Sequence, residues 1–270
     1  MNLPRHIKRA AKLASGTLLA PLRPGNVAML HAGRSGSSVL GNLLHQHPEI
    51  VWDREVFKPG RIEALCGNGP AKGLAQRPLT VLRLLMSRAG RRFYGFETQL
   101  TQLERLGLEL PDYVERLVGM KFTHFIVLER KNTLRRIASV LVGRSAARWH
   151  LTQADGEPAL ERIHFGIEDL NLRGQPKPLL QHLRDSRDTF GLLDECLRDK
   201  QVLRLSYEDD IAERPERAYR RVCEFLGLQP SEVSVLLRKT NPFPLRQMVT
   251  NFEDLERALA GTEFAWMLSD

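Results

Sequence analysis

Short apolar segments alternate along the chain with longer amphipathic ones. Five of the short segments are rich in β-branched and aromatic residues and are bounded by turn-forming residues, which predicts strands. They are NVAMLH (26–31), EIVW (49–52), RFYGFET (92–98), KFTHFIVLE (121–129) and QVLRLSYED (201–209). Apolar runs of this kind are typical of strands that are buried on both faces of a parallel sheet.

The segments between these strands have apolar residues at helical spacing. The predicted helices are SSVLGNLLHQH (37–47), RPLTVLRLLMSRAG (77–90), PDYVERLVG (111–119), NTLRRIASVLVGRSAARW (132–149) and RPERAYRRVCEFLG (214–227). Pro111 suits the first turn of its helix, and Gly227 suits the end of another. Alternation of strand and helix predicts an α/β fold in three layers, with a central, mostly parallel sheet flanked by helices.

The pattern predicts one α/β domain over residues 26–270, with loop insertions near 66–78 and 152–178. Long loops of this kind often form lids or binding loops. Residues 1–25 are predicted to contain an amphipathic helix from about Pro4 to Leu19. The run TLLAPL is shorter than the ~7 to 15 apolar residues of a secretory signal. We expect this helix to pack on its own domain, with peripheral contact to an anionic membrane surface as the alternative.

Composition narrows the class of protein. With 42% hydrophobic and 27% charged residues, and no apolar run near the ~20 residues that span a bilayer, the sequence excludes an integral membrane protein. Its three cysteines are scattered and lack CxxC spacing, so they predict neither a disulfide framework nor a zinc site. They favour a reducing compartment, and we expect a cytoplasmic location, with the inner membrane surface as the site of any peripheral contact.

The charge balance indicates an anionic partner. The formal net charge is +8, and such an excess attracts nucleotides, nucleic acids or membrane surfaces. Only 7% of the residues are aromatic, and they do not alternate with basic residues. A stacking platform for single-stranded nucleic acid is therefore disfavoured.

The run HAGRSGSS after the first strand is the strongest candidate for a binding loop. Gly33 and Gly36 permit positive φ, Arg34 adds a charge, and Ser37 and Ser38 add hydroxyl groups. Backbone N–H groups at the start of the following helix would bind phosphate oxygens. The competing interpretation is an ordinary turn in which Ser37 caps the helix. No Lys stands where the Walker A pattern requires one, which disfavours an ATPase or GTPase.

A second candidate anion site follows the fourth predicted strand. Arg130 comes directly after KFTHFIVLE, and Ser139 lies nine residues later on the next helix. Ligands of open α/β sheets bind at the carboxyl ends of the strands, so Arg130 and Ser139 are placed to share one anion. The alternative is that Arg130 is a surface charge and Ser139 a helix-packing residue.

Together these segments resemble the PAPS-dependent sulfotransferases, especially the bacterial carbohydrate branch related to nodulation-factor and trehalose sulfotransferases. The resemblance covers residues from about 26 to the C-terminus, apart from the two insertions. It rests on four segments, which are GRSGSSVLGNLLHQHPEI, FIVLERKNTLRRIAS, LRLSYEDDIAERPERAYRRVCEFLGL and VTNFEDLERALAGTEF. It implies a P-loop-like α/β fold and transfer of a sulfuryl group from 3′-phosphoadenosine 5′-phosphosulfate (PAPS) to an acceptor hydroxyl. A sugar or glycolipid acceptor is implied, without a metal or a nucleic-acid partner.

The resemblance also implies roles for individual residues. Gly33, Arg34, Gly36 and the backbone N–H groups from Ser35 to Ser38 correspond to the loop that holds the 5′-phosphosulfate. Arg130 and Ser139 correspond to the residues that hold the 3′-phosphate, although their interval is one residue longer than in the branch that acts on small phenols. Three further residues are placed at the nucleotide: Tyr207 near the adenine, and Arg238 or Lys239 closing over it.

The resemblance places the catalytic base in WDREVF. Glu55 is the candidate, followed two residues later by the aromatic Phe57, and Asp53 is the nearest rival. The base would take the proton of the acceptor hydroxyl, while Arg34 would stabilise the leaving group. The histidine base of the small-phenol branch has no clear counterpart, which leaves His124 and His150 as alternatives.

Two other functions compete with sulfuryl transfer. A divergent P-loop-like kinase using ATP would need a Lys at the end of the loop, which the sequence lacks. A basic protein without catalytic activity could bind anionic glycans or nucleic acid through the Arg-rich helix from Thr133 to Arg148. The insertions that would select the acceptor carry no recognisable motif, and the sequence leaves the oligomeric state open.

Overall fold

A computed structural model describes residues 20–58, 60–62, 78–172, 174 and 176–269. The predicted N-terminal helix and nearly all of the predicted insertion at 66–78 lie outside the described residues. Among the helices that are described, none is both long enough and apolar enough to cross a membrane.

The chain forms two compact units. Unit 1 comprises residues 1–129 and 196–235, and unit 2 comprises residues 130–195 and 236–270. The predicted domain that begins at residue 26 therefore contains parts of two units. The predicted insertion at 152–178 belongs to unit 2.

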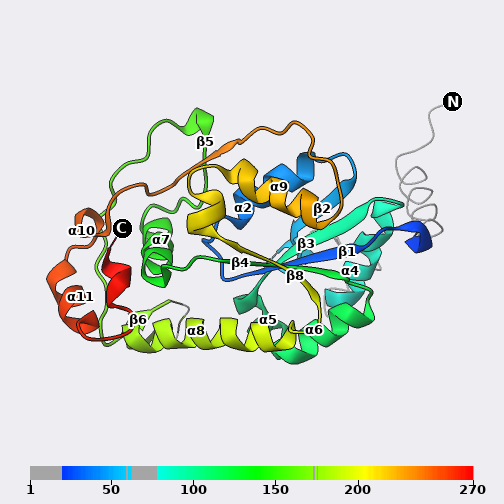
Figure 1. Ribbon diagram of the computed structural model, residues 1–270. Coiled ribbons are helices and arrows are strands. Elements are labelled where there is room, and N and C mark those ends of the chain that lie inside the picture. Colours follow the sequence, from blue (N-terminus) through cyan, green and yellow to red (C-terminus); the bar gives the residue numbers. More distant parts are fainter. Residues whose placement is uncertain (1–19, 59, 63–77, 173, 175, 270) are drawn as a thin grey trace. The chain divides into compact units, whose positions relative to one another are not determined.

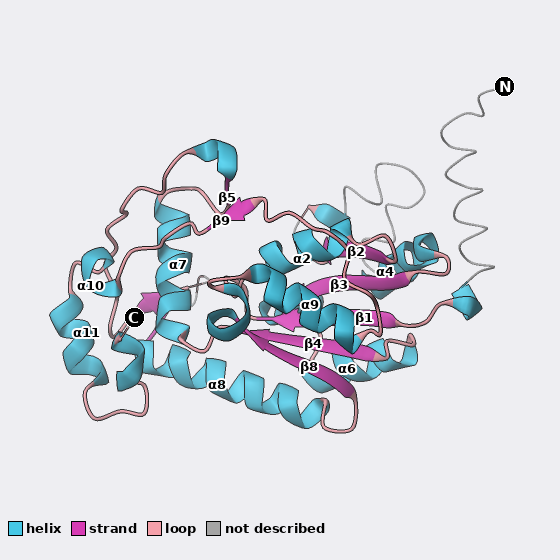
Figure 2. Cartoon of the chain, turned by 45° about the horizontal axis from the view of Figure 1, so that its top comes forward, coloured by secondary structure: helices cyan, strands magenta, loops and turns pink. Residues whose placement is uncertain are grey.

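Unit 1 contains a sheet of five parallel strands in the order β2-β3-β1-β4-β8 (Figure 2). The strands are β1 (Asn26–His31), β2 (Ile50–Glu55), β3 (Phe93–Gln99), β4 (His124–Glu129) and β8 (Gln201–Ser206). All five predicted strands and the predicted α/β fold are confirmed.

The last predicted strand is shorter than expected. Residues 207–209 were predicted to extend it, but they begin the π-helical turn η6 (Tyr207–Ile211). Ser206 Oγ accepts a hydrogen bond from the backbone N–H of Asp209, at 3.0 Å. Asp210 in turn accepts one from the N–H of Ser206, at 2.9 Å. These local bonds satisfy groups that would otherwise continue the strand.

Helices cover both faces of this sheet (Figure 1). The α-helices of unit 1 are α2 (Ser37–Gln46), α4 (Pro78–Met86), α5 (Leu103–Leu106), α6 (Leu110–Gly119) and α9 (Pro215–Phe225). Its 3-10 turns are η1 (Ala20–Leu22), η3 (Ser87–Ala89) and η4 (Leu100–Gln102). On one face, α2 and α9 pack against the strands through a mostly aliphatic core. On the other face the core is aromatic and includes Tyr94, Phe96 and Phe122, which contact one another edge-on or stacked.

The strand order places a topological switch point beside β1. The chain leaves β1 toward β2 at one edge of the sheet, and it leaves β4 toward β8 at the other edge. Because β1 and β4 are neighbours, their connections diverge at the carboxyl ends of the two strands. Open α/β sheets bind ligands at such a point, so the loop that follows His31 occupies the position expected of a binding loop.

Unit 2 is mainly helical. Its α-helices are α7 (Thr133–Ser145), α8 (Leu179–Cys196), α10 (Leu245–Met248) and α11 (Phe252–Leu259), with 3-10 turns η5 (Gln153–Asp155) and η7 (Ala265–Leu268). Its short strands pair as β5 (Leu151–Thr152) with β9 (Leu237–Arg238), and as β6 (Leu170–Asn171) with β7 (Pro176–Lys177). Apolar side chains from α7, α8, α10 and α11 share one core. The sequence did not predict α8, because its apolar positions are separated by many charged ones.

Candidate functional site

The loop between β1 and α2, residues 32–38, has a backbone suited to an anion; we refer to it as the cradle. The φ angle is 78° at Gly33, 54° at Arg34 and 87° at Gly36. Gly36 is the N-cap of α2 and no side chain makes a cap hydrogen bond, so the interpretation of Ser37 as the cap is wrong. The N–H groups in the first turn of an α-helix have no partner within the helix, and they carry its positive dipole end.

Gly33 and Gly36 of the cradle combine a positive φ angle with close neighbours. A Cβ atom on Gly33 would lie 2.5 Å from Gln99 Nε2, at the end of β3. One on Gly36 would lie 2.8 Å from Ile211 Cγ2 and 3.1 Å from the ring of Tyr207. Tyr207, predicted to lie near the adenine of a nucleotide, is therefore beside the cradle within unit 1.

Ser35 adds a buried hydroxyl group to the cradle. Its residue is fully buried, and its Oγ has no hydrogen-bond partner among the described residues. A buried hydroxyl group without a partner costs roughly 1 to 3 kcal/mol. An anion oxygen bound to the cradle would accept this hydrogen bond and remove that cost.

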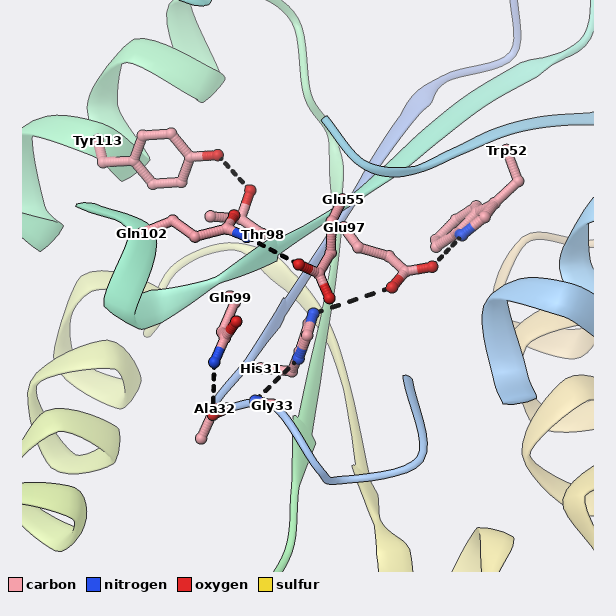
Figure 3. A network of polar contacts seen from close by, with 10 residues as sticks. All are labelled: His31, Ala32, Gly33, Trp52, Glu55, Glu97, Thr98, Gln99, Gln102 and Tyr113. Atoms are coloured by element: carbon pink, nitrogen blue, oxygen red, sulfur yellow. Dashed lines mark hydrogen bonds and ion pairs between the residues drawn. The ribbon is translucent and has the colours of Figure 1, made fainter. Parts of the chain in front are cut away.

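A cluster of three ionisable side chains lies at the carboxyl ends of three adjacent strands (Figure 3). His31 ends β1, Glu55 ends β2 and Glu97 lies near the end of β3. One nitrogen or oxygen atom from each lies within 4.8 Å of the others. Sequence reasoning selected Glu55 but missed His31 and Glu97. Their position at the carboxyl ends of predicted strands was the available signal.

A β-bulge at Arg54 directs Glu55 into this cluster. Asp53 pairs with Phe96 across the sheet, whereas Glu55 pairs with Glu97, so β2 has one residue more than β3 here. Bulges commonly re-aim a side chain beside a functional site. Asp53 instead accepts a hydrogen bond from Arg88, at 3.2 Å. Glu55, and not its rival Asp53, therefore joins His31 and Glu97.

Phe57 anchors the chain that leaves the bulge. It is 5% exposed and meets Phe96 edge-on, with ring centroids 5.8 Å apart. A second edge-on contact joins it to Tyr113 of α6, at 6.2 Å. The aromatic residue predicted to accompany the base thus packs into the core of the sheet and holds the end of β2 in place.

Each member of the cluster is fixed by one hydrogen bond (Figure 3). Gln102 donates to Glu55 Oε2 at 2.8 Å, and Trp52 Nε1 donates to Glu97 Oε1 at 2.9 Å. The backbone N–H of Gly33 donates to His31 Nδ1 at 3.0 Å. Because Gly33 belongs to the cradle, this last bond connects the cradle directly to the cluster.

Burial keeps two of the three groups uncharged at neutral pH. It lowers the pKa of His31 to about 3. It raises the pKa of Glu97 to about 8, and the nearby Glu55 carboxylate adds to this effect while the Trp52 hydrogen bond opposes it. The contact of 3.9 Å between His31 Nε2 and Glu97 Oε2 therefore joins two neutral groups and is not an ion pair.

The donor set does not fit a metal ion. His31 Nδ1 accepts the Gly33 N–H, so the ring proton of the neutral imidazole is on Nε2, and that atom has no free lone pair for a metal. The spacing is also wide. Zinc and magnesium bind ligands at ~2.1 Å, which places adjacent ligand atoms ~3.0 to 3.4 Å apart. The separation of 3.9 Å between His31 and Glu97 is larger.

The remaining predicted nucleotide ligands lie in unit 2. Arg130 directly follows β4 and is 8% exposed, and Ser139 of α7 is 2% exposed. Arg238 of β9 donates to Glu157 at 3.0 Å and to the carbonyl of Gly156 at 3.1 Å. The roles of these residues and of Lys239 at a nucleotide stay predictions.

The alternative histidine bases are unfavourably placed. His124 is the first residue of β4 and therefore lies at the amino edge of the sheet, opposite the cradle. His150 is exposed and belongs to unit 2. Neither residue belongs to the cluster of Glu55.

The Arg-rich helix is not a free basic surface. In α7, Arg135 donates to the carbonyl of Phe243 at 2.6 Å, and Arg144 donates to that of Asn171 at 2.8 Å. Arg136 is 9% exposed and donates to Ser186 Oγ at 3.3 Å. These arginines hold unit 2 together, which weakens the interpretation of α7 as a nucleic-acid or glycan interface.

Comparisons with known proteins add a structural likeness. No protein-family model matches the chain, and no curated protein matches its sequence. Among solved structures, the chain is similar to the crystal structure of a sulfotransferase from Alicyclobacillus acidocaldarius, with 16% identity and a TM-score of 0.46. The match covers 81% of this chain and 87% of that one. A TM-score of this size does not establish a shared fold, so the function is argued from the residues of this chain.

Replacing Gly41 should disturb the cluster. A Cβ atom here would lie 2.0 Å from Glu97 Oε1 and 2.9 Å from Trp52 Nε1. We expect Gly41→Ala to lower the free energy of unfolding by ~1 to 3 kcal/mol, despite the higher helix propensity of alanine. The control is Gly191→Ala in α8, where a Cβ meets nothing within 4 Å; it should gain ~0.5 to 1 kcal/mol. Urea unfolding measures the change in the free energy of unfolding for both variants. Equal changes would contradict the close packing around Gly41.

Glu97→Gln should change how stability depends on pH. The pKa of Glu97 rises from 4.5 to about 8 on folding, so between these values the folded chain keeps a proton that the unfolded chain loses. The wild type should therefore lose up to ~1.4 kcal/mol per pH unit as the pH rises across this window. The variant lacks this loss. Its stability relative to the wild type should rise from pH 4.5 to 8 and level off above; a constant difference in urea unfolding would refute the raised pKa.

Proposed function

We propose that the chain is a PAPS-dependent sulfotransferase that moves a sulfuryl group to a hydroxyl of a carbohydrate or glycolipid acceptor. The observation that carries the proposal is the bond from Gly33 N–H to His31 Nδ1, which makes the anion cradle and the carboxylate cluster one continuous site. An enzyme that transfers an anionic group to a hydroxyl needs an anion-binding loop and a base next to each other. The sequence resemblance supplies the identity of the donor and the class of acceptor.

The cradle suits the 5′-phosphosulfate of the donor. Backbone N–H groups from Ser35 to Ser38 would bind its oxygens, with the buried Ser35 hydroxyl as a further donor. Negative charge develops on the bridging oxygen as the sulfur–oxygen bond breaks. Hydrogen-bond donors fixed in advance and the Arg34 charge stabilise this oxygen, and each such donor is worth roughly 3 to 4 kcal/mol.

A 3′-phosphate distinguishes this donor from ATP. We assign its recognition to Arg130 and Ser139, because an arginine at a strand end can make charge-assisted bonds to phosphate. Tyr207 is assigned to the adenine, since its ring already lies beside Gly36. Closure of Arg238 or Lys239 over the nucleotide would require Arg238 to exchange its ion pair with Glu157.

Glu55 is assigned as the general base. Gln102 fixes one of its oxygens, which leaves the other to take the proton of the acceptor hydroxyl. As that proton leaves, the hydroxyl oxygen bonds to sulfur and the bond from sulfur to the bridging phosphate oxygen breaks in line. The products are the sulfate ester and adenosine 3′,5′-bisphosphate. General base catalysis of this type typically contributes ~10² to 10⁴-fold.

The competing functions receive less support. A kinase would use a cradle Lys on a triphosphate, whereas the only charged residue of the cradle sequence is Arg34 and no Lys is present. A non-catalytic binding protein would use a free basic surface, whereas arginines of α7 are bonded within unit 2. We place the enzyme in the cytoplasm, with peripheral membrane contact through residues 1–25 as the alternative.

Nucleotide binding tests the donor assignment. Isothermal titration should show that adenosine 3′,5′-bisphosphate binds with the same affinity with and without Mg²⁺. Arg130→Ala should weaken binding at least ~10-fold, because a charge-assisted contact to the 3′-phosphate is lost. The control Arg220→Ala, an exposed residue on α9, should bind within about twofold of the wild type. Preference for Mg·ATP would indicate the kinase, and absence of any nucleotide binding would indicate the binding protein.

Turnover tests the base. With labelled PAPS and a panel of saccharides, lipid-linked sugars and phenols, Glu55→Gln should lower kcat by ~10² to 10⁴-fold. Its affinity for adenosine 3′,5′-bisphosphate should stay unchanged. Asp53→Asn is the matched control, because Asp53 contacts Arg88 and not the cluster, and its kcat should stay within a few-fold of the wild type. A wild-type kcat in Glu55→Gln would show that another group is the base.

A further inference from the structure

The cluster presents three polar atoms to one point (Figure 3). Glu55 Oε2, Glu97 Oε1 and His31 Nδ1 are each taken by a fixing hydrogen bond. In each of these three side chains, the second polar atom faces the other two side chains. His31 is fully buried, and its Nε2 has no hydrogen-bond partner among the described residues. A buried donor in this state indicates a ligand atom that the chain itself does not supply.

The chemistry of the three atoms selects the kind of ligand. Because His31 Nδ1 accepts the Gly33 N–H, His31 Nε2–H is a donor. The second oxygen of Glu55 is an acceptor, and the neutral Glu97 carboxyl can do either. A hydroxyl group both accepts and donates, so it satisfies His31 and Glu55 together. An anion would be repelled by Glu55, and a cation would meet the Nε2–H proton.

The spacing agrees with a hydroxyl oxygen. The three groups offer atoms within 4.8 Å of one another. With 3.9 Å between His31 and Glu97 and at most 4.8 Å along the other two edges, the point equidistant from the three atoms lies about 2.6 Å or less from each. An oxygen atom slightly out of their plane is then about 2.8 Å from each, which is the length of an ordinary hydrogen bond. An oxygen atom at this point would contact all three groups without displacing any of their fixing bonds.

We propose that His31, Glu55 and Glu97 together form the binding site for the acceptor hydroxyl. This inference rests on the proposed sulfotransferase function. His31 Nε2–H donates to the hydroxyl oxygen and occupies one lone pair, and the hydroxyl proton points at Glu55. The second lone pair then attacks sulfur as Glu55 takes the proton. Glu97 lines the site as an uncharged neighbour that takes neither lone pair of the hydroxyl in this step, which leaves Glu55 as the base.

The arrangement also selects a class of acceptor. A hydroxyl that carries its proton can donate to Glu55, so the site fits an aliphatic alcohol such as a sugar hydroxyl. A phenolate has no proton to donate and would place a second negative charge beside Glu55. The site therefore favours alcohols over ionised phenols, for a reason independent of the sequence resemblance.

The tautomer of His31 can be measured without any turnover. In the full chain labelled with ¹⁵N-histidine, the His31 resonances are identified by their loss in His31→Gln. We expect a neutral ring with the proton on Nε2 at pH 7, and no change on addition of Zn²⁺ alone. A proton on Nδ1, or a shift of the resonance with Zn²⁺, would overturn the proposal in favour of a metal ligand.

Kinetics then test the role of the donor. The acceptor is the saccharide with the highest turnover in the panel, or methanol if none is turned over. His31→Ala should raise the acceptor KM or lower kcat so that kcat/KM falls at least ~10-fold. Because this variant also removes the bond from Gly33 N–H, Kd for adenosine 3′,5′-bisphosphate is measured beside it, and a loss of kcat/KM no larger than the loss of nucleotide affinity would overturn the proposal. His31→Gln, which can place an N–H near the same point, should recover part of the loss. His164→Gln, an exposed histidine of unit 2, is the control and should keep wild-type turnover.

Variants of Glu97 provide a second kinetic test. If Glu97 acts as a neutral partner, Glu97→Gln should retain at least ~10-fold more kcat/KM than Glu97→Ala, and the inflection of its pH profile near pH 8 should disappear. Equal losses in both variants would overturn the proposal, as would a kcat loss in Glu97→Gln as large as that in Glu55→Gln. If the wild type binds no adenosine 3′,5′-bisphosphate, the sulfotransferase function itself is rejected.

Discussion

One hydrogen bond, from the backbone N–H of Gly33 to His31 Nδ1, organises the candidate site. It requires the chain to turn immediately after β1, which the positive φ of Gly33 permits. The same bond fixes which nitrogen of His31 carries the proton. The geometry of the anion cradle and the hydrogen-bonding character of the cluster therefore depend on one local conformation.

Burial imposes the second constraint. Burial disfavours the charged forms of His31 and Glu97, and the nearby Glu55 adds to the effect on Glu97. With His31 and Glu97 neutral, Glu55 is the member of the cluster that we assign as the base. The cradle adds a cost of its own, because a non-glycine residue such as Arg34 with φ of 54° typically costs ~1 to 3 kcal/mol. Such costs accumulate at functional sites and are offset by the well-packed sheet on which the site lies.

Much of unit 1 could be predicted from the sequence. The five strands were predicted from their apolar runs. The glycines of the cradle were predicted from their position between a strand and a helix. Glu55 was found by its place in a resembling motif. The bulge at Arg54 could not be read from the sequence, because alternation alone does not show where the register shifts. For that reason the pairing of Glu55 with Glu97, which separates Glu55 from Asp53, emerged only in the structure. The charged helix α8 was missed because its apolar stripe is interrupted.

The central claim is that the cradle and the cluster are the two halves of one site for a sulfuryl donor and an acceptor hydroxyl. The most direct test is a crystal structure of the chain with adenosine 3′,5′-bisphosphate. The account predicts that oxygens of the 5′-phosphate lie within hydrogen-bond distance of the N–H groups of Ser35 to Ser38, with the phosphate facing Glu55. A nucleotide bound elsewhere, or bound at the cradle with its 5′-phosphate turned away from Glu55, would contradict it.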